Sequence, residues 1–333
     1  DKLNNENADH LRWWFNSISS RNISCSNLFQ NHCYMEILDR LWENQKNFPQ
    51  LIVVESYGLA KAIEKWASTK HICVKIIAGS SNKVLKNIRN LFSVLLHLIY
   101  YALIFFLRWG NAFFTRRFDF NNVNTKLKND QRVIIDTFID QQSFTEQGAF
   151  IDRYYPYLYK YLADNGKAIL VHPVLAGFRF NYYKVYIRMR KSKIPFIIPE
   201  DHLRFSDYLA ALFCPVLIHF DRLKIIPLNK YDFTELLKEE EKVLNNFSSC
   251  TAMLIYRLFL RIGKTGVKPD YVINWYENQV IDKALIAGIR KAFPDIKIIG
   301  TQVFLRSSNL LNSFPSQSEA NANLVPDILL ETS

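Results

Sequence analysis

The stretch that decides the fold is "PDYVINWYENQVIDKALIAGIRKAFPDIKIIGTQ", Pro269 to Gln302. Its apolar, β-branched run at 271–276 predicts a buried strand. The apolar spacing at 278–293 predicts a helix, and 296–302 predicts a second strand. A strand, a helix and a strand in this order are typical of a right-handed crossover between parallel strands. The stretch therefore predicts an α/β fold.

Short apolar runs alternate with helical segments along most of the remaining chain. The other predicted strands are 51–56, 71–79, 132–138, 167–173, 195–201 and 326–331. Seven or eight such strands predict a Rossmann-like, mostly parallel sheet with helices on both faces. Two helical insertions, about 81–118 and about 205–263, interrupt the alternation.

Composition narrows the class of protein. A chain of 333 residues with 49% hydrophobic residues can bury a large core, which excludes a disordered protein. Gly and Pro number only 10 and 11, which argues against an all-β fold rich in turns. We expect residues 1–323 to form one Rossmann-like domain and residues 324–333 to begin a second domain that is mostly missing from this chain.

The positive charge is concentrated around the first insertion. Between Lys65 and Phe118 the sequence has nine Lys or Arg residues and no Asp or Glu, in a chain of net charge +11. An uncharged run of 17 residues, 91–107, lies inside this zone. As a helix it would be about 26 Å long, which is the short limit for a membrane span.

Polar residues recur along one side of this predicted helix, so three interpretations stay open. The helix lies in the plane of an anionic membrane surface, is buried in the protein core, or spans a membrane. The first interpretation predicts membrane contacts at Lys86, Arg89, Leu95, Ile99, Phe106 and Arg108. A nucleic-acid partner is not expected, because no recognised nucleic-acid motif accompanies the basic residues.

Almost every predicted strand ends in a polar or ionisable residue. Ligands bind outside the carboxyl ends of the strands in open α/β sheets, so these residues predict a cleft at that edge. They are Glu55, Asp136, His172, Glu200, Asp201, His202, Glu277, Thr301 and Gln302.

The turn after the strand at 271–276 carries a carboxylate beside aromatic residues. Trp275 and Tyr276 precede Glu277, and rings of this kind stack on sugars or bases. A carboxylate in such a cleft suits a general base that deprotonates a hydroxyl nucleophile. The structural alternative is that Glu277 only caps the following helix and that both rings belong to the core.

The sequence lacks the usual cofactor signatures. No Gly-rich phosphate loop follows a strand, and no His or Cys pattern indicates a metal. We therefore expect no metal and no cofactor bound by this segment.

Four segments carry a resemblance to a known family. They are "HLRWWFNSISSRNISCSNLF" (10–29), "DTFIDQQSFTEQGAFIDRYYPYLYKYL" (136–162), "PEDHLRFSDYLAAL" (199–212) and "NWYENQVIDKALIAGIRKAFPDIKIIGTQ" (274–302). Together they resemble bacterial glycosyltransferase-like proteins of surface-polysaccharide (capsule or O-antigen) biosynthesis. Such proteins are similar to GT-B enzymes, which have two Rossmann-like domains facing across a cleft.

The resemblance implies a cytoplasmic protein that is peripheral on the inner face of the plasma membrane. This chain would be the N-terminal half, which binds a lipid-linked or membrane glycan acceptor. The missing half would bind the nucleotide sugar that serves as donor substrate.

The resemblance also implies roles for the edge residues. We expect Asp136, Glu277 or Glu200, in that order, to be the general base, and His172 to orient the acceptor or share its proton. The residues expected to bind substrate are Arg153, Tyr154, Trp275, Tyr276 and Gln302.

Two other functions stay open. One is a non-catalytic scaffold that tethers a partner to the membrane. The other is a polyol-phosphate transferase of cell-wall polymer synthesis, which would use a CDP-alcohol in place of a sugar nucleotide.

Overall fold

The computed structural model describes residues 10–22, 25–44, 48–79, 83–118, 131–178, 180–217, 231–243, 247–302 and 311–331. The strands are β1 (Leu51–Val54), β2 (Lys75–Ala78), β3 (Gln131–Ile139), β4 (Ala168–Leu175), β5 (Lys268–Trp275), β6 (Lys297–Gln302) and β7 (Ile328–Glu331). The α-helices are α2 (Leu11–Trp14), α3 (Leu28–Glu43), α4 (Tyr57–Thr69), α5 (Lys83–Thr115), α7 (Leu158–Asp164), α8 (Tyr182–Lys191), α9 (Pro199–His202), α10 (Phe205–Leu217), α11 (Thr234–Val243), α12 (Phe247–Ile262), α13 (Val280–Ala292) and α14 (Gln317–Asn321). Short 3-10 helices are η1 (Ser17–Ser20), η2 (Arg116–Phe118) and η4 (Leu311–Ser313).

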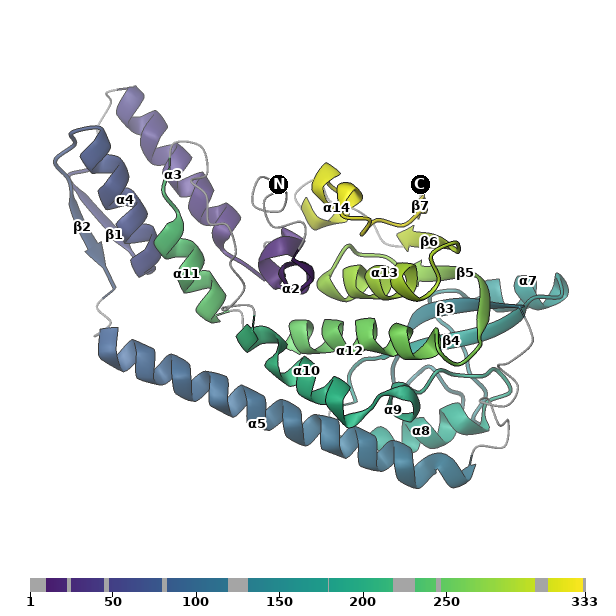
Figure 1. Ribbon diagram of the computed structural model, residues 1–333. Coiled ribbons are helices and arrows are strands. Elements are labelled where there is room, and N and C mark those ends of the chain that lie inside the picture. The colour runs from purple at the N-terminus through teal and green to yellow at the C-terminus, as the bar shows by residue number, and fades with distance from the viewer. Residues whose placement is uncertain are drawn as a thin grey trace.

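The main sheet has five parallel strands in the order β4-β3-β5-β6-β7 (Figure 1). The stretch from Pro269 to Gln302 forms most of β5 and all of α13 and β6, as predicted. Asp136 of β3 lies opposite His172 of β4 and Asn274 of β5. Because all five strands run the same way, their carboxyl ends lie along one edge. The prediction of an α/β fold with a parallel sheet is confirmed.

Helices cover both faces of this sheet. Successive side chains of a strand point to opposite faces, and β3 divides its apolar residues accordingly. Ile134 packs in the large core that includes Phe259 of α12 and Leu285 of α13. Val133 and Ile135 pack on the other face in a cluster with Leu162 of α7. Burial on both faces explains why these strands read as unbroken apolar runs.

The prediction that all strands join one sheet is wrong. β1 and β2 form a separate two-stranded parallel sheet. The chain leaves β2 through α5, whose 33 residues extend for about 50 Å. Figure 1 shows the small sheet near one end of α5 and the main sheet near the other. A rigid connection of that length keeps β1 and β2 away from β3.

The predicted strand at 195–201 is also absent from the sheet. A single bridge joins Phe196 to Val171, where Ile197 N–H donates to the Val171 carbonyl oxygen (2.7 Å). Pro199 then begins α9 at a position that suits proline. Prolines at 195 and 199 cannot donate to a ladder, so the pairing stops after one bridge.

The helical insertions form where the sequence places them. Residues 81–118 contain α5 and η2, and residues 205–263 contain α10, α11 and α12. Residues 328–331, expected at the start of a second domain, form β7 at the edge of the main sheet beside β6. α7 begins at Leu158, so Arg153 and Tyr154 lie in the loop before it.

Candidate functional site

A buried polar layer lies near the carboxyl ends of β3, β4 and β5. The Asp136 carboxylate is hydrogen-bonded through Oδ1 to Nδ1 of His172 (2.6 Å). Its Oδ2 accepts a hydrogen bond from Nδ2 of Asn274 (2.8 Å). Asp136 is 4% exposed, His172 2% and Asn274 0%, so solvent barely reaches them. This layer can fix the groups above it, but a substrate cannot touch it without movement.

Asp282 joins this layer from the first turn of α13. Its Oδ2 accepts the backbone N–H of Gln279 (2.9 Å) and of Glu277 (3.1 Å), which caps the helix and holds the turn after β5. Burial raises the pKa of Asp282 to about 8, and the nearby carboxylate of Asp136 contributes in the same direction. The two backbone N–H groups oppose this shift because they favour the charged form.

This raised pKa predicts a stability that falls as pH rises. The unfolded chain releases the Asp282 proton near pH 3.8, whereas the folded protein keeps it to about pH 8. Between these values the folded state binds more protons, so the contribution is full below pH 3.8 and is lost by about pH 8. The expected slope is at most ~1.4 kcal/mol per pH unit.

Asp282→Asn keeps the acceptor oxygen of the cap but cannot titrate. The difference in free energy of unfolding, wild type minus variant, should therefore fall between about pH 4 and pH 8. Urea unfolding followed by circular dichroism at several pH values measures this difference. A difference that stays constant across the range would contradict the buried, protonated Asp282.

Above the buried layer, a carboxylate lies among aromatic rings at the sheet edge. We call Glu277, Trp275, Tyr154, Phe138 and Arg153 together the rim. Glu277 is half-buried, and its Oε1 accepts the indole N–H of Trp275 (2.8 Å). The rings of Tyr154 and Trp275 meet edge to face with centroids 4.4 Å apart, and Phe138 lies 6.1 Å from Trp275. The exposed Arg153 comes directly before Tyr154 in the same loop, and its guanidinium pairs with the carboxylate of Asp140. A partly exposed acid, aromatic rings and a guanidinium suit a polar, ring-shaped ligand.

The structure separates the three carboxylates expected as the base. Glu277 lies at the rim and Asp136 lies in the buried layer. Glu200 lies in α9, where its Oε1 accepts a hydrogen bond from Nε of Arg108 (2.7 Å) and only 3% of the residue is exposed. It is not part of the layer or the rim, because the segment that carries it does not enter the sheet.

Three residues expected to bind substrate are buried. Trp275 is 8% exposed and packs in the cluster that includes Ile135, so Tyr154 is the more exposed ring of the pair. The side chains of the other two point into the protein. Tyr276 is fully buried in the large core. Gln302 is 1% exposed, and its Nε2 donates to the backbone oxygen of Ser313 (2.9 Å). The strand alternation explains Tyr276, since Trp275 and Tyr276 must point to opposite sides.

A second buried cluster lies next to the rim and fastens the N-terminal segment to α13. Glu319 of α14 pairs with Nζ of Lys283 (2.8 Å) and with the guanidinium of Arg21 (2.9 Å). Lys283 also donates to the Ser19 carbonyl oxygen (2.9 Å). Burial alone would raise the pKa of Glu319, but Lys283 and Arg21 outweigh it and lower that pKa. The cluster is structural, since Lys283 and Glu319 are both 0% exposed.

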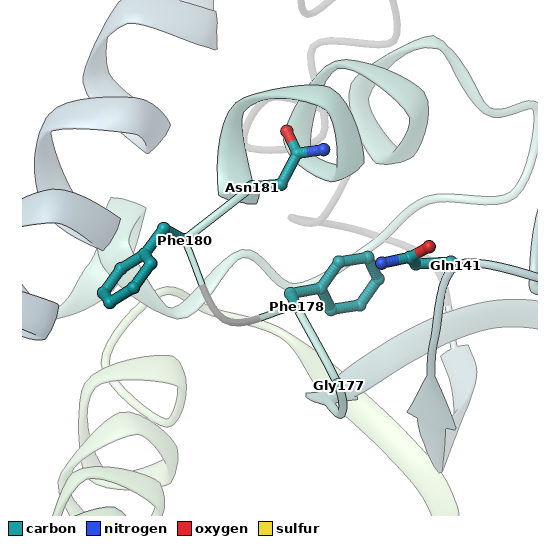
Figure 2. Close-up of a pocket in the computed structure, with 5 residues that line it drawn as sticks. All are labelled: Gln141, Gly177, Phe178, Phe180 and Asn181. Carbon is teal, nitrogen blue, oxygen red and sulfur yellow. The ribbon is translucent and has the colours of Figure 1, made fainter.

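An open pocket of about 590 Å³ lies just beyond the ends of β3 and β4. Figure 2 shows the ring of Phe178 directed toward Gln141, while Phe180 points away from it. Gly177 turns the loop with a φ of 75°, which glycine adopts without strain. The lining residues are Gln141, Gly177, Phe178, Phe180 and Asn181.

The predicted site does not include these pocket residues, because none of them is ionisable and all lie in the loops that follow β3 and β4. The composition of those loops is the sequence signal that would indicate them. The strand ends lie three residues, or roughly 10 Å, from Asp136 and His172. The nearest lining residues, Gln141 and Gly177, come two residues further along the chain. The pocket is therefore a separate opening on the same edge as the rim.

Within the described residues, no group of three or more His, Cys, Asp or Glu side chains is placed to hold a metal ion.

Compared with known proteins, the chain matches no family model, no curated protein and no solved structure.

Proposed function

We propose that this chain is the acceptor-binding half of a GT-B-type glycosyltransferase of surface-polysaccharide synthesis. It works on the inner face of the plasma membrane, as a cytoplasmic, peripheral protein. The acceptor is a lipid-linked or membrane glycan, and the donor is a nucleotide sugar held by a second Rossmann-like half. The single observation that carries the proposal is Glu277, a half-buried carboxylate among aromatic rings at the carboxyl edge of a parallel sheet.

In this proposal Glu277 is the general base. The acceptor sugar lies against the half-buried ring of Tyr154, which packs on the buried Trp275, and one of its hydroxyls faces the Glu277 carboxylate. The hydroxyl oxygen forms a bond to the anomeric carbon of the donor while the bond from that carbon to the nucleotide breaks. Glu277 takes the hydroxyl proton, and the nucleotide leaves with the electron pair. Asp136 and His172 are positioning residues in this account.

Glu277 is preferred to Asp136 because a general base must reach the proton that it removes. Asp136 is 4% exposed and uses both carboxylate oxygens within the protein. The guanidinium of Arg153, exposed in the loop before α7, suits a phosphate or carboxylate of the acceptor.

A panel of donors tests the proposal. The full-length protein is incubated with membrane extract and, separately, with UDP-, GDP-, dTDP- and CMP-sugars and with CDP-glycerol. We expect nucleotide release from one sugar nucleotide that depends on the extract. Release from CDP-glycerol alone would replace the proposal with a polyol-phosphate transferase.

A non-catalytic tether is the second candidate, and the burial of Asp136 and His172 favours it. A protein that only anchors a partner does not need ionisable groups that reach a substrate, so these groups can be buried. In the donor panel, no release from any donor by a protein that still binds membranes would support the tether and reject the transferase.

A further inference from the structure

We infer that the outward face of α5 is a docking surface for an anionic bilayer, and that the helix lies in the membrane plane. In naming the partner of the proposed transferase, the inference rests on the proposed function. Its test contains no donor, however, so failure of docking and failure of transfer can be told apart. The residues of this outward face are Phe92, Leu95, Leu96, Ile99, Tyr100, Leu103, Phe106, Leu107, Trp109, Phe113 and Phe114, all exposed.

The first observation is that α5 has apolar residues on both of its sides. Ile104 and Phe105 pack in the large core, whereas the residues of the outward face turn away from the protein. An ordinary surface helix buries its apolar side and exposes charge. The outward face is apolar or aromatic throughout, with Leu103 57% and Phe106 70% exposed. Figure 1 shows α5 running along one side of the molecule with the other elements on its inner side. So large an exposed apolar surface is typical of a docking site.

The second observation is that the only charged residue between Phe92 and Phe114 points inward. Arg108 pairs with the buried Glu200 (2.7 Å) and lies over the ring of Tyr182. Arg190 of α8 donates to Oγ1 of Thr115 (3.1 Å). These polar contacts, together with the buried Ile104 and Phe105, fix the rotation of α5 about its axis and leave the outward face exposed.

The same contacts argue against a membrane span. The described chain has one helix that is apolar and long enough to cross a bilayer, Phe92–Phe118, with a mean hydropathy of 1.7. A crossing orientation would place the Arg108–Glu200 pair, and the α8 and α9 segments attached to it, within the hydrocarbon region. Charged groups at that depth are costly. A helix in the membrane plane immerses only its outward side.

Charge favours a lipid surface over a protein partner. Residues 65–118 contain no acidic residue. Beyond the end of α5, Arg117 and Lys191 flank the ring of Phe118 at 5.0 Å and 5.4 Å, and Arg116 is exposed. Basic residues beside an apolar helix face bind anionic headgroups while the apolar side chains enter the acyl boundary.

Of the six predicted membrane contacts, the structure assigns Leu95, Ile99 and Phe106 to this outward face. Arg108 is on the inner side, since its guanidinium is paired within the protein. Lys86 and Arg89 belong to α5, but their side chains lie outside the described residues.

Vesicle binding tests the inference. The full-length protein, without donor, is sedimented with vesicles of phosphatidylcholine alone or with about one-quarter phosphatidylglycerol. We expect strong binding to the anionic vesicles, weakened by salt. The double variant Leu103→Asp, Phe106→Asp should bind about 100-fold more weakly. Equal binding by wild type and variant would overturn the inference.

The matched control is Tyr157→Asp, Tyr161→Asp, which changes two aromatic residues at α7. They are 83% and 64% exposed, which is comparable with the exposure of Leu103 and Phe106. It should bind like wild type, which separates a face-specific effect from added negative charge. A loss of binding in this control as great as in the α5 variant would overturn the inference.

Two further readouts separate the rival occupants. Trp109 should be quenched most by lipids brominated near the headgroup end of the chain, measured as the difference from Trp109→Phe. Strongest quenching from the bilayer centre would overturn the in-plane orientation. Light scattering in vesicle-free solution should show no dimer that depends on Leu103 and Phe106. Such a dimer would assign the outward face to a second copy of the protein.

Discussion

Replacing Glu277 by Gln is expected to slow sugar transfer by roughly 10²- to 10⁴-fold, the range that a general base contributes. The amide can no longer take the proton of the attacking hydroxyl. It still offers an oxygen to the indole N–H of Trp275, so the rim should keep its shape. The loss should appear in kcat, with KM little changed, because the acceptor still lies against the ring of Tyr154.

The control for this variant is Asp270→Asn, which alters a carboxylate at the amino end of the same strand. Asp270 pairs with Lys167 on the side of the sheet away from the rim. Its transfer rate should match that of wild type. Steady-state assays with the donor selected by the panel measure both variants. Unchanged turnover in Glu277→Gln would remove Glu277 from the mechanism.

Replacing Glu319 by Ala is expected to lower the free energy of unfolding by about 3–5 kcal/mol. Lys283 would lose its 2.8 Å partner in a site where both residues are 0% exposed. Burial already lowers the pKa of Lys283, and without Glu319 nothing comparable offsets that cost. Arg21 would lose the same carboxylate, so the N-terminal segment would be held less firmly.

The matched control is Glu64→Ala, which breaks the exposed pair with Lys61 on α4. Exposed pairs contribute about 0–1 kcal/mol, so this variant should stay close to wild type. Adding Lys283→Met to Glu319→Ala should restore part of the stability, because no unpaired ammonium then remains. Urea denaturation gives all four values. A Glu319→Ala protein as stable as Glu64→Ala would contradict this account of the buried cluster.

The main sheet could be predicted from sequence because its strands are buried on both faces. Unbroken apolar runs at β3, β4 and β5 follow directly from that burial. Local pattern could not show that β1 and β2 pair only with each other, because sheet membership depends on the path that α5 imposes. The local pattern also predicted a strand at 195–201 that does not form, because two prolines limit its pairing to one bridge.

The sequence predicted which residues lie at the carboxyl edge of the sheet, but not which of them are buried and which reach solvent. Strand ends identified Asp136, His172 and Glu277, and the parallel register places Asp136 beside His172. Which of them reaches solvent depends on the turn after β5 and on Asp282, whose cap holds Glu277. That contact joins residues five apart across a turn, and no periodic pattern shows it.

The orientation of α5 shows a similar limit. Its sequence displays a polar stripe and an apolar side, but amphipathicity alone does not say which side meets the protein. The partners of Arg108 and Thr115 come from α9 and α8, far along the chain. Those long-range contacts decide which apolar residues of α5 face outward and which, such as Ile104 and Phe105, are buried.

The most direct test of the proposed function is mass spectrometry of the lipid extract after transfer. The full-length protein is incubated with membrane vesicles and with the donor that the panel selects. The account predicts a glycolipid heavier by one sugar residue, formed only when vesicles are present. An extract without that species, whether the donor stays intact or is hydrolysed to free sugar, would contradict the assignment of this protein as a membrane glycosyltransferase.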